Sequence, residues 1–573
     1  MYDLLLRDAR IVDGTGNPWQ SGDVAIIGQK IAAVGRLGRS PARRVIDASG
    51  RVVSPGFIDI HGHSDYLVLA DPLAENKLWQ GITTDVSGNC GFSAAPLGEV
   101  WLQEWWVENP DDRFTVVSRA AGKEVLARHG IELDWSSLGE YFARIEENGL
   151  AVNYASFVGQ VALRLAVTGE YSRRPSAAEL RQMKALLARA MQQGALGFST
   201  ESGSHRGMDF DLAELNELCQ AAARYGGSYA CHMRSYDDQM IASLKEALHT
   251  AEVARIPLIL SHLMVNGLEN AGKSRLVLDL IEEARDRGLQ VAVDIFPYWF
   301  EEALHFSPLL SSVLPEWASD GGPVALRAAV RDPPQRARLL AELRAGKSSR
   351  AYVVPGRTEQ EAYGLSPLKR LHWENSLRIT ACRGGEQFVG QTAAQAARAL
   401  GVDPFEAILD LLALDAEARK AFVSPNEADL RALMRYPGTA FGTDGGLVRA
   451  ILRAGAPSPV LYASFPHVLG HYVRREKVLS LEDAVRKMTS LPAQTLGLAD
   501  RGLLRPRMQA DVVMFDPDTV DGVEISDPAA GRNTAYTNQG IELVIVNGQV
   551  ALEGRAPTGA RPGKILRRQA RRF

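Results

Sequence analysis

The stretch "PGFIDIHGHSD", Pro55 to Asp65, places two histidines at the end of an apolar run. Residues 57–60 have the composition of a buried strand, and His61 and His63 follow it with only Gly62 between them. Side chains alternate across a strand, so residues two positions apart point the same way. His61 and His63 can therefore converge on one point, and Gly62 leaves room beside it. The motif predicts a metal site at the end of this strand.

Other apolar runs also end in residues of metal-binding type. They are Cys90 in "TTDVSGNCGFS", His232 in "SYACHMRS", His262 in "IPLILSHL" and Asp444 in "AFGTDGG". The chain has only 11 His and 4 Cys, so their recurrence at strand ends indicates a shared site. Zn²⁺ binds imidazole, thiolate and carboxylate, and a catalytic site keeps one position open for water. A thiolate can bridge two ions, so Cys90 can join a site built from His61 and His63 to one built from His232 and His262.

The middle of the chain alternates strand-like and helix-like segments. Runs such as "IPLILSHL" and "LQVAVDIFPY" have strand composition, whereas "SAAELRQMKALLARAMQQG" has helical spacing. Alternation of this kind predicts parallel βα units, and their number favours a (β/α)8 TIM-like barrel over an open sheet. We expect this α/β barrel to span residues 55–499. In such barrels the active site lies at the carboxyl ends of the strands.

Two regions depart from that alternation. Residues 1–54 and 500–573 are short β-rich runs separated by Gly and Asp, which predicts one small sheet domain built from both termini. Residues from about 299 to 374 contain "SDGGP", "RDPPQ" and "VVPGR" without a clear strand. We expect an inserted lid subdomain there.

Composition narrows the class of protein. The chain of 573 residues is 46% hydrophobic and 23% charged, as in ordinary globular proteins, and its net charge of −4 argues against a nucleic-acid surface. Charged residues interrupt the N-terminal apolar run, and no segment has the length of a membrane span, so we expect a cytoplasmic protein without a membrane partner. Four cysteines do not make a disulfide framework. The sequence leaves a homo-oligomer open.

Taken together, the motifs resemble the amidohydrolase superfamily and, within it, the N-acyl-D-amino-acid deacylase (D-aminoacylase) family. The resemblance covers almost the whole chain and rests on "GFIDIHGHSD", "GITTDVSGNCGFSAAP", "HMRS", "GTDGG" and "RKMTSLPAQ". It implies a barrel with a small β-sandwich from both termini, and a zinc-dependent amide (C–N) hydrolase with one or two ions. By the family pattern, Cys90, His232 and His262 hold the tighter zinc. His61 and His63 form a weaker second site that shares Cys90.

The resemblance also implies that Asp444 is the general acid/base. A carboxylate beside an activated water can take its proton and pass that proton to a leaving amine. Two other interpretations stay open, one enzymatic and one structural. The same site chemistry would serve a cyclic amide, a carbamate or a urea-like bond. A barrel that has lost its chemistry would be a non-catalytic scaffold.

Several residues bear on the substrate, which we expect to be a small-molecule amide with an apolar or aromatic group. The family usually carries a basic residue two positions after its second lone metal histidine, where this chain has Met264. A thioether cannot bind a free carboxylate, and Arg234 is a candidate to replace that charge, with help from Tyr298. Glu201 is a candidate extra ligand or a neighbour of the ligands, and His205 a candidate pocket residue. The tryptophans near residue 101 are core residues or a pocket wall.

Overall fold

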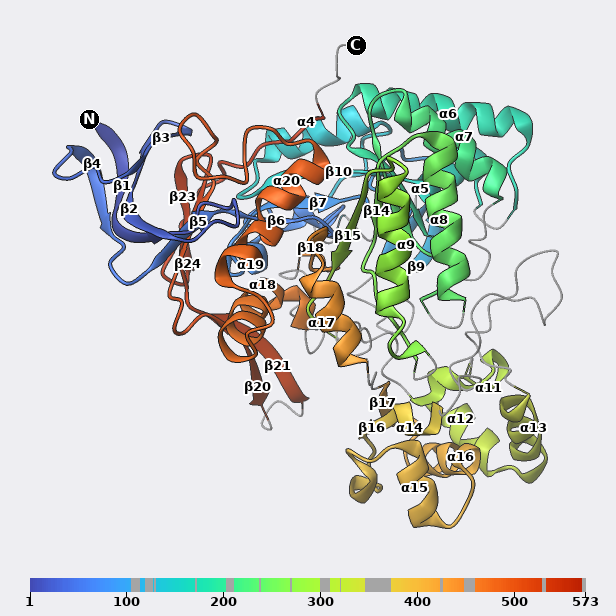
Figure 1. Ribbon diagram of the computed structural model, residues 1–573. Coiled ribbons are helices and arrows are strands. Elements are labelled where there is room, and N and C mark those ends of the chain that lie inside the picture. Colours follow the sequence, from blue (N-terminus) through green and yellow to red (C-terminus); the bar gives the residue numbers. More distant parts are fainter. Residues whose placement is uncertain are drawn as a thin grey trace.

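The computed structural model describes most of the chain (Figure 1). The described residues are 1–104, 114–118, 127, 130–170, 173–201, 211–236, 239–267, 270–298, 310–319, 321–345, 373–422, 426–447, 459–527 and 532–568. His205, Trp105, Trp106 and the segment 299–309 lie outside them, so the expectations about those residues stay predictions.

Both ends of the chain build one nine-stranded sheet, in which blue and red strands lie side by side in Figure 1. Its strands are β1 (Tyr2–Ile11), β2 (Gln20–Ile27), β3 (Lys30–Gly35), β4 (Ala42–Asp47), β5 (Val52–Pro55), β19 (Val512–Phe515), β22 (Ile541–Val546), β23 (Gln549–Glu553) and β24 (Ala556–Pro557). The order is β24-β23-β22-β19-β5-β1-β2-β3, with β4 beside β1. Antiparallel β5 and β19 join the two halves, and Leu6, Val53 and Met514 share one apolar core.

A second set of strands runs parallel through the middle of the protein. It comprises β6 (Phe57–Asp59), β7 (Ile82–Ser87), β10 (Asn153–Ser156), β11 (Val158–Gly159), β12 (Gly197–Glu201), β13 (Ser228–His232), β14 (Leu258–Leu260), β15 (Val291–Ile295) and β18 (Thr439–Phe441). The order is β10-β7-β6 in one sheet and β11-β12-β13-β14-β15-β18 in the other. Only Phe157 separates β10 from β11, and an isolated parallel bridge joins Gly62, after β6, to Gly445, after β18. Parallel pairing brings the carboxyl ends of neighbouring strands together.

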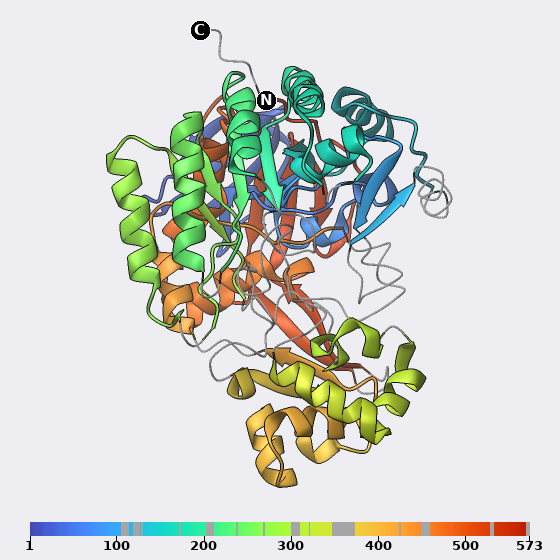
Figure 2. The same ribbon diagram turned by 90° about the vertical axis from the view of Figure 1, so that its right-hand side faces the viewer.

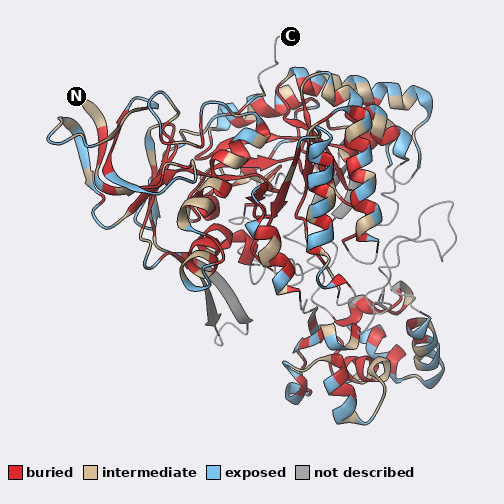
Figure 3. Ribbon diagram, viewed as in Figure 1, coloured by how far each residue is buried: buried red, intermediate tan, exposed pale blue. Residues whose placement is uncertain are grey.

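Helices connect and cover the parallel strands. They include α4 (Leu138–Asn148), α5 (Gln160–Thr168), α6 (Ala177–Gln192), α7 (Leu212–Ala223), α8 (Met240–Ala254), α9 (Ser274–Asp286), α17 (Glu427–Arg435), α19 (Leu481–Met488) and α20 (Ser490–Leu496). Helix α6 begins at a capping box in which the side chains of Ser176 and Glu179 accept hydrogen bonds from each other's backbone N–H. It buries Met183, Leu187 and Met191, which recur at helical spacing. Figure 3 shows the strands in red and the outer faces of these helices in pale blue.

A separate unit projects from the strand ends in both Figure 1 and Figure 2. It contains η2 (Leu310–Val313), α11 (Glu316–Ser319), α12 (Gly322–Arg331), α13 (Pro333–Arg344), α14 (Trp373–Ser376), β16 (Leu377–Ala381), η5 (Glu386–Phe388), α15 (Ala393–Leu400), α16 (Pro404–Leu414) and β17 (Arg419–Phe422). Its own apolar core extends from Leu310 to Ala418. The expected insertion ended near residue 374, whereas the shared core continues beyond it because β16 pairs with β17 and packs with α15 and α16.

The remaining elements are mostly short. They are α1 (Leu67–Ala70), α2 (Glu75–Leu78), β8 (Val100–Glu104), β9 (Phe114–Ser118), η6 (Pro459–Leu461), α18 (Ser464–His467), the π-helix η7 (Val468–Arg475), β20 (Asp521–Asp527) and β21 (Arg532–Gln539). Among the described residues, no helix combines the length and apolar character needed to cross a bilayer.

Candidate metal centre and active site

The turns after the parallel strands carry the predicted site side chains. His61 and His63 follow β6, Cys90 follows β7, His232 ends β13, His262 follows β14 and Asp444 follows β18. Cys90, His262 and Asp444 have positive φ angles of 49°, 33° and 52°. Residues other than glycine seldom adopt this conformation, and such strain concentrates at functional sites because the surrounding structure must enforce it. The fold therefore holds three of these side chains in place against a local backbone cost.

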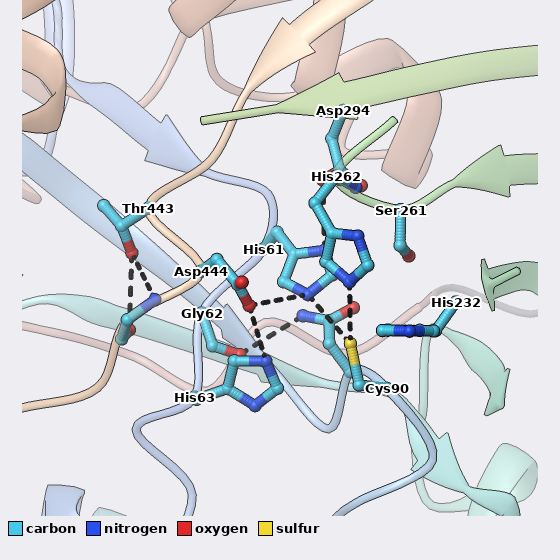
Figure 4. A network of polar contacts seen from close by, with 12 residues as sticks. His61, Gly62, His63, Cys90, His232, Ser261, His262, Asp294, Thr443 and Asp444 are labelled. Atoms are coloured by element: carbon cyan, nitrogen blue, oxygen red, sulfur yellow. Dashed lines mark hydrogen bonds and ion pairs between the residues drawn. The ribbon is translucent and has the colours of Figure 1, made fainter. Parts of the chain in front are cut away.

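Two overlapping groups of candidate ligands share Cys90. They are His61, His63, Cys90 and Asp444, and Cys90, His232 and His262; within each group the ligand atoms lie within 4.8 Å of one another. The Cys90 Sγ lies 3.3 Å from Nε2 of both His61 and His262. Figure 4 shows these side chains converging from different strand ends. Imidazole, thiolate and carboxylate donors in this number fit Zn²⁺.

Asp444 lies among the imidazoles. Its Oδ1 is 3.0 Å from His63 Nε2 and 3.4 Å from His61 Nε2. Burial raises the pKa of Asp444, but the hydrogen bond from His63 and the neighbouring imidazoles of His262 and His61 hold that pKa well below its usual range. The Asp444 carboxylate is therefore ionised in the metal-free protein.

Asp294 contacts two of the candidate ligand histidines, His61 and His262, although no sequence motif marks it. Its Oδ1 lies 3.1 Å from His61 Nδ1 and accepts the His262 backbone N–H at 2.7 Å. Burial lowers the pKa of His61, but the carboxylates of Asp294, Asp444 and Asp59 raise that pKa to about 9. A carboxylate behind a ligating imidazole fixes its tautomer and strengthens it as a ligand. The signal in the sequence was a lone acidic residue in the apolar strand "VAVDI".

Glu201 occupies the corresponding position behind His232. Its Oε2 lies 3.2 Å from His232 Nδ1, which leaves Nε2 of that ring to face the site. Glu201 belongs to neither group of candidate ligands. Of the two roles considered for it, the contact supports that of a neighbour that orients a ligand.

Gly62 leaves room for a carboxylate. A Cβ atom at this position would overlap Oδ1 of Asp85, which lies 3.3 Å from the Lys77 ammonium group. Asp59 approaches the same Lys77 Nζ at 2.6 Å, and all three charged side chains are buried. The His-Gly-His turn therefore packs against a buried ionic cluster that no sequence motif indicates.

The expected substrate-contacting residues fall into two environments. Tyr298 belongs to an apolar cluster with Phe296 and Tyr462, and Met264 packs against it. The Phe296 ring is 6.4 Å from that of His262, so the cluster borders the site. Arg234, in contrast, donates from Nε to Glu246 at 2.6 Å, which compensates its charge.

The fold and site together define the class: an α/β protein with candidate metal-ligand side chains gathered at the ends of parallel strands. The model of the Amidohydrolase family matches residues 44–552. N-acyl-D-glutamate deacylase of Alcaligenes xylosoxydans xylosoxydans is 34% identical over 99% of this chain and 97% of its own. The chain therefore belongs to the amidohydrolase family, and the resemblance inferred from its motifs is confirmed.

Solved structures of deacylases are similar to this chain over nearly its whole length. The crystal structure of N-acyl-D-glutamate deacylase from Bordetella bronchiseptica, complexed with zinc and a phosphonate inhibitor, has a TM-score of 0.70 and 31% identity, covering 99% of this chain and 100% of that one. A structure of D-aminoacylase, whose binuclear metal centre has been studied, has a TM-score of 0.69 and 30% identity with the same coverage. This chain accordingly has the mixed α/β fold of these amidohydrolases.

Proposed function

We propose that the protein is a metal-dependent hydrolase of amide C–N bonds, similar to D-aminoacylases. The observation that carries the proposal is the pair of ligand groups sharing Cys90, with Asp444 Oδ1 3.0 Å from His63 Nε2. Relatives of this chain include deacylases, and the crystal structure of one such deacylase is complexed with zinc. A zinc ion held by these ligands supplies a Lewis acid that polarises a carbonyl and lowers the pKa of water toward about 7.

The candidate side chains have separate roles in this proposal. Cys90, His232 and His262 would hold a first ion, and His61 and His63 would hold a second with Cys90 as a common ligand. The Asp444 carboxylate takes the proton of the attacking water and returns it to the departing nitrogen. A scaffold that had lost its chemistry would not need these donors, and each predicted ligand position carries a competent side chain.

The architecture belongs to the same proposal. We propose that the parallel strands close into a (β/α)8 barrel over residues 55–499, and the bridge between Gly62 and Gly445 supports closure between β6 and β18. The nine-stranded sheet from both termini supports a small β-sandwich domain over residues 1–54 and 500–573.

For the substrate, we propose an amide with an apolar or aromatic group beside the scissile bond. The cluster of Phe296, Tyr298 and Tyr462 with Met264 against it offers apolar contacts next to His262. A carboxylate placed against this cluster would lose its hydration, and none of the described residues that form the cluster is a cation. The ion pair between Arg234 and Glu246 supports the same conclusion, because that guanidinium already has a carboxylate partner.

A substrate panel tests both parts of the proposal. The zinc-loaded protein is assayed for amine release from N-acetyl-D-leucine, N-acetyl-D-glutamate and a neutral aromatic amide such as acetanilide. We expect hydrolysis of the leucine derivative or of acetanilide to exceed that of the glutamate derivative. Preference for the glutamate derivative would overturn the apolar assignment, and no hydrolysis of any amide would overturn the enzymatic one.

A further inference from the structure

We propose that Lys77 is a positioning residue for Asp444: its buried ammonium group fixes the turn that aims the Asp444 carboxylate at the imidazoles. This inference rests on the proposed function, in which Asp444 transfers the proton. Lys77 itself lies on α2, outside the parallel strands.

The Lys77 ammonium group contacts both residues that flank Asp444. Its Nζ lies 3.2 Å from Thr443 Oγ1 and donates to the Gly445 carbonyl oxygen at 2.9 Å. The third close partner is Asp59, whose Oδ2 accepts at 2.6 Å. The Lys77 side chain is only 1% exposed, so its charge depends on these oxygens in place of water. Moving the turn would therefore deprive a buried cation of two partners at once.

Asp59 holds the same turn from the other side. It accepts the Thr443 backbone N–H at 2.9 Å and the Thr443 hydroxyl at 2.6 Å. The Asp444 N–H donates to the His61 carbonyl oxygen at 2.8 Å, and His63 N–H donates to Gly445 O at 3.1 Å. These contacts lock the turn onto the His-Gly-His segment.

The strained backbone of Asp444 explains why such a lock is needed. With φ at +52°, Asp444 occupies a left-handed conformation that persists only when neighbouring contacts enforce it. Helix α2 also contacts Gly446, the last residue of this turn, because Asn76 Nδ2 donates to the Gly446 carbonyl oxygen at 3.0 Å. A purely structural role for Lys77, which would neutralise Asp59 and Asp85, predicts lost stability without a change in the Asp444 position.

The test compares two variants of this contact with a matched control. Lys77→Met removes the ammonium group, and Thr443→Val removes only the hydroxyl that bridges Lys77 and Asp59. Lys487→Met is the control: Lys487 is also a buried lysine, and it donates to the carbonyl groups of Thr439, the first residue of β18, and of Tyr436, which precedes that strand. Zinc content, kcat and KM are measured for each, and crystal structures are determined for Lys77→Met and Thr443→Val.

We expect Lys77→Met to lower kcat about 10- to 100-fold, a part of the roughly 10²–10⁴-fold that acid–base catalysis contributes. We expect Thr443→Val to have a smaller effect in the same direction. Zinc content and KM should stay near wild type in both, and the Asp444 carboxylate should move away from His63 Nε2 in the crystal structures. Lys487→Met should keep its kcat.

Unchanged kcat and an unmoved Asp444 in these variants would overturn the proposal, as would an equal loss of kcat in Lys487→Met. If Lys77→Met does not fold, Thr443→Val decides by the same two readouts. If the wild-type protein hydrolyses no amide, the proposed function fails, and the crystallographic position of Asp444 still decides the role of Lys77.

Discussion

Replacing Asp294 with asparagine should weaken zinc binding to the group that contains His61. The Asp294 Oδ1 lies 3.1 Å from His61 Nδ1, and the two side chains are 2% and 1% exposed. Asparagine keeps an oxygen acceptor of the same shape and removes the charge. A hydrogen bond to a charged group contributes about 1.5–3 kcal/mol and a neutral one about 0.5–1.5 kcal/mol. The loss of about 1–1.5 kcal/mol corresponds to an approximately tenfold weaker Kd for zinc.

The size of this effect should depend on pH, because zinc must displace a proton from His61. The His61 pKa is about 9 in the metal-free protein, so the imidazole is protonated below that pH. Each pH unit below it costs about 1.36 kcal/mol, or tenfold in apparent affinity. Asp294→Asn removes the foremost contribution that raises this pKa, so proton competition begins at a lower pH in the variant. The gap between the two proteins should therefore narrow from about pH 9.5 toward about pH 7.

Zinc titration against a chelating indicator, corrected for the indicator's own protonation, measures both quantities. Glu201→Gln is the matched control, because Glu201 contacts His232, which is a member of the other ligand group. Glu201→Gln should weaken zinc binding to the group that contains His232. It should not change the pH dependence of zinc affinity that comes from protonation of His61. Equal zinc affinity of wild type and Asp294→Asn at about pH 9.5, or identical pH slopes, would refute the reasoning.

Two further substitutions test the shared thiolate and the buried cluster beneath the site. Cys90→Ser removes the donor common to both ligand groups, so zinc measured by plasma mass spectrometry should fall well below one ion per chain; wild-type zinc content would mean that Cys90 binds no metal. Gly62→Ala places a methyl group against Asp85 and should lower the free energy of unfolding of the metal-free protein by about 1–3 kcal/mol. An unchanged urea midpoint for Gly62→Ala would contradict the close approach of Asp85.

Candidate site residues are easiest to select from the sequence where a motif coincides with the end of a strand. His61, His63 and Cys90 could be selected because parallel βα units bring the carboxyl ends of their strands together, whatever the loops between them do. The family was identifiable from the same motifs, and the comparisons confirm it. The alternation of strand and helix likewise predicted the parallel strands that carry the site.

The residues that support the site could not be identified from the sequence, because tertiary contacts determine whether they are buried and what they bind. Lys77 lies in a short polar helix, where a lysine is ordinarily solvated, yet the turn after β18 buries it. Arg234 follows β13, the strand that ends in the candidate ligand His232, and this position made Arg234 a candidate to bind the substrate. In the structure it forms an ion pair with Glu246 on α8. The core of the separate unit continues to Ala418, beyond the predicted boundary near residue 374. The sequence does not reveal this, because α15 and α16 have ordinary amphipathic patterns that do not show which core they join.

The central claim is tested most directly by measuring zinc content and amide turnover together, in wild type and in Asp444→Asn. The account predicts one or two zinc ions in both proteins, amide hydrolysis by the wild type, and a loss of about 100-fold or more in kcat for the variant. Wild-type turnover in zinc-loaded Asp444→Asn would contradict the role of the aspartate. A wild-type protein that neither binds zinc nor hydrolyses an amide would contradict the account as a whole.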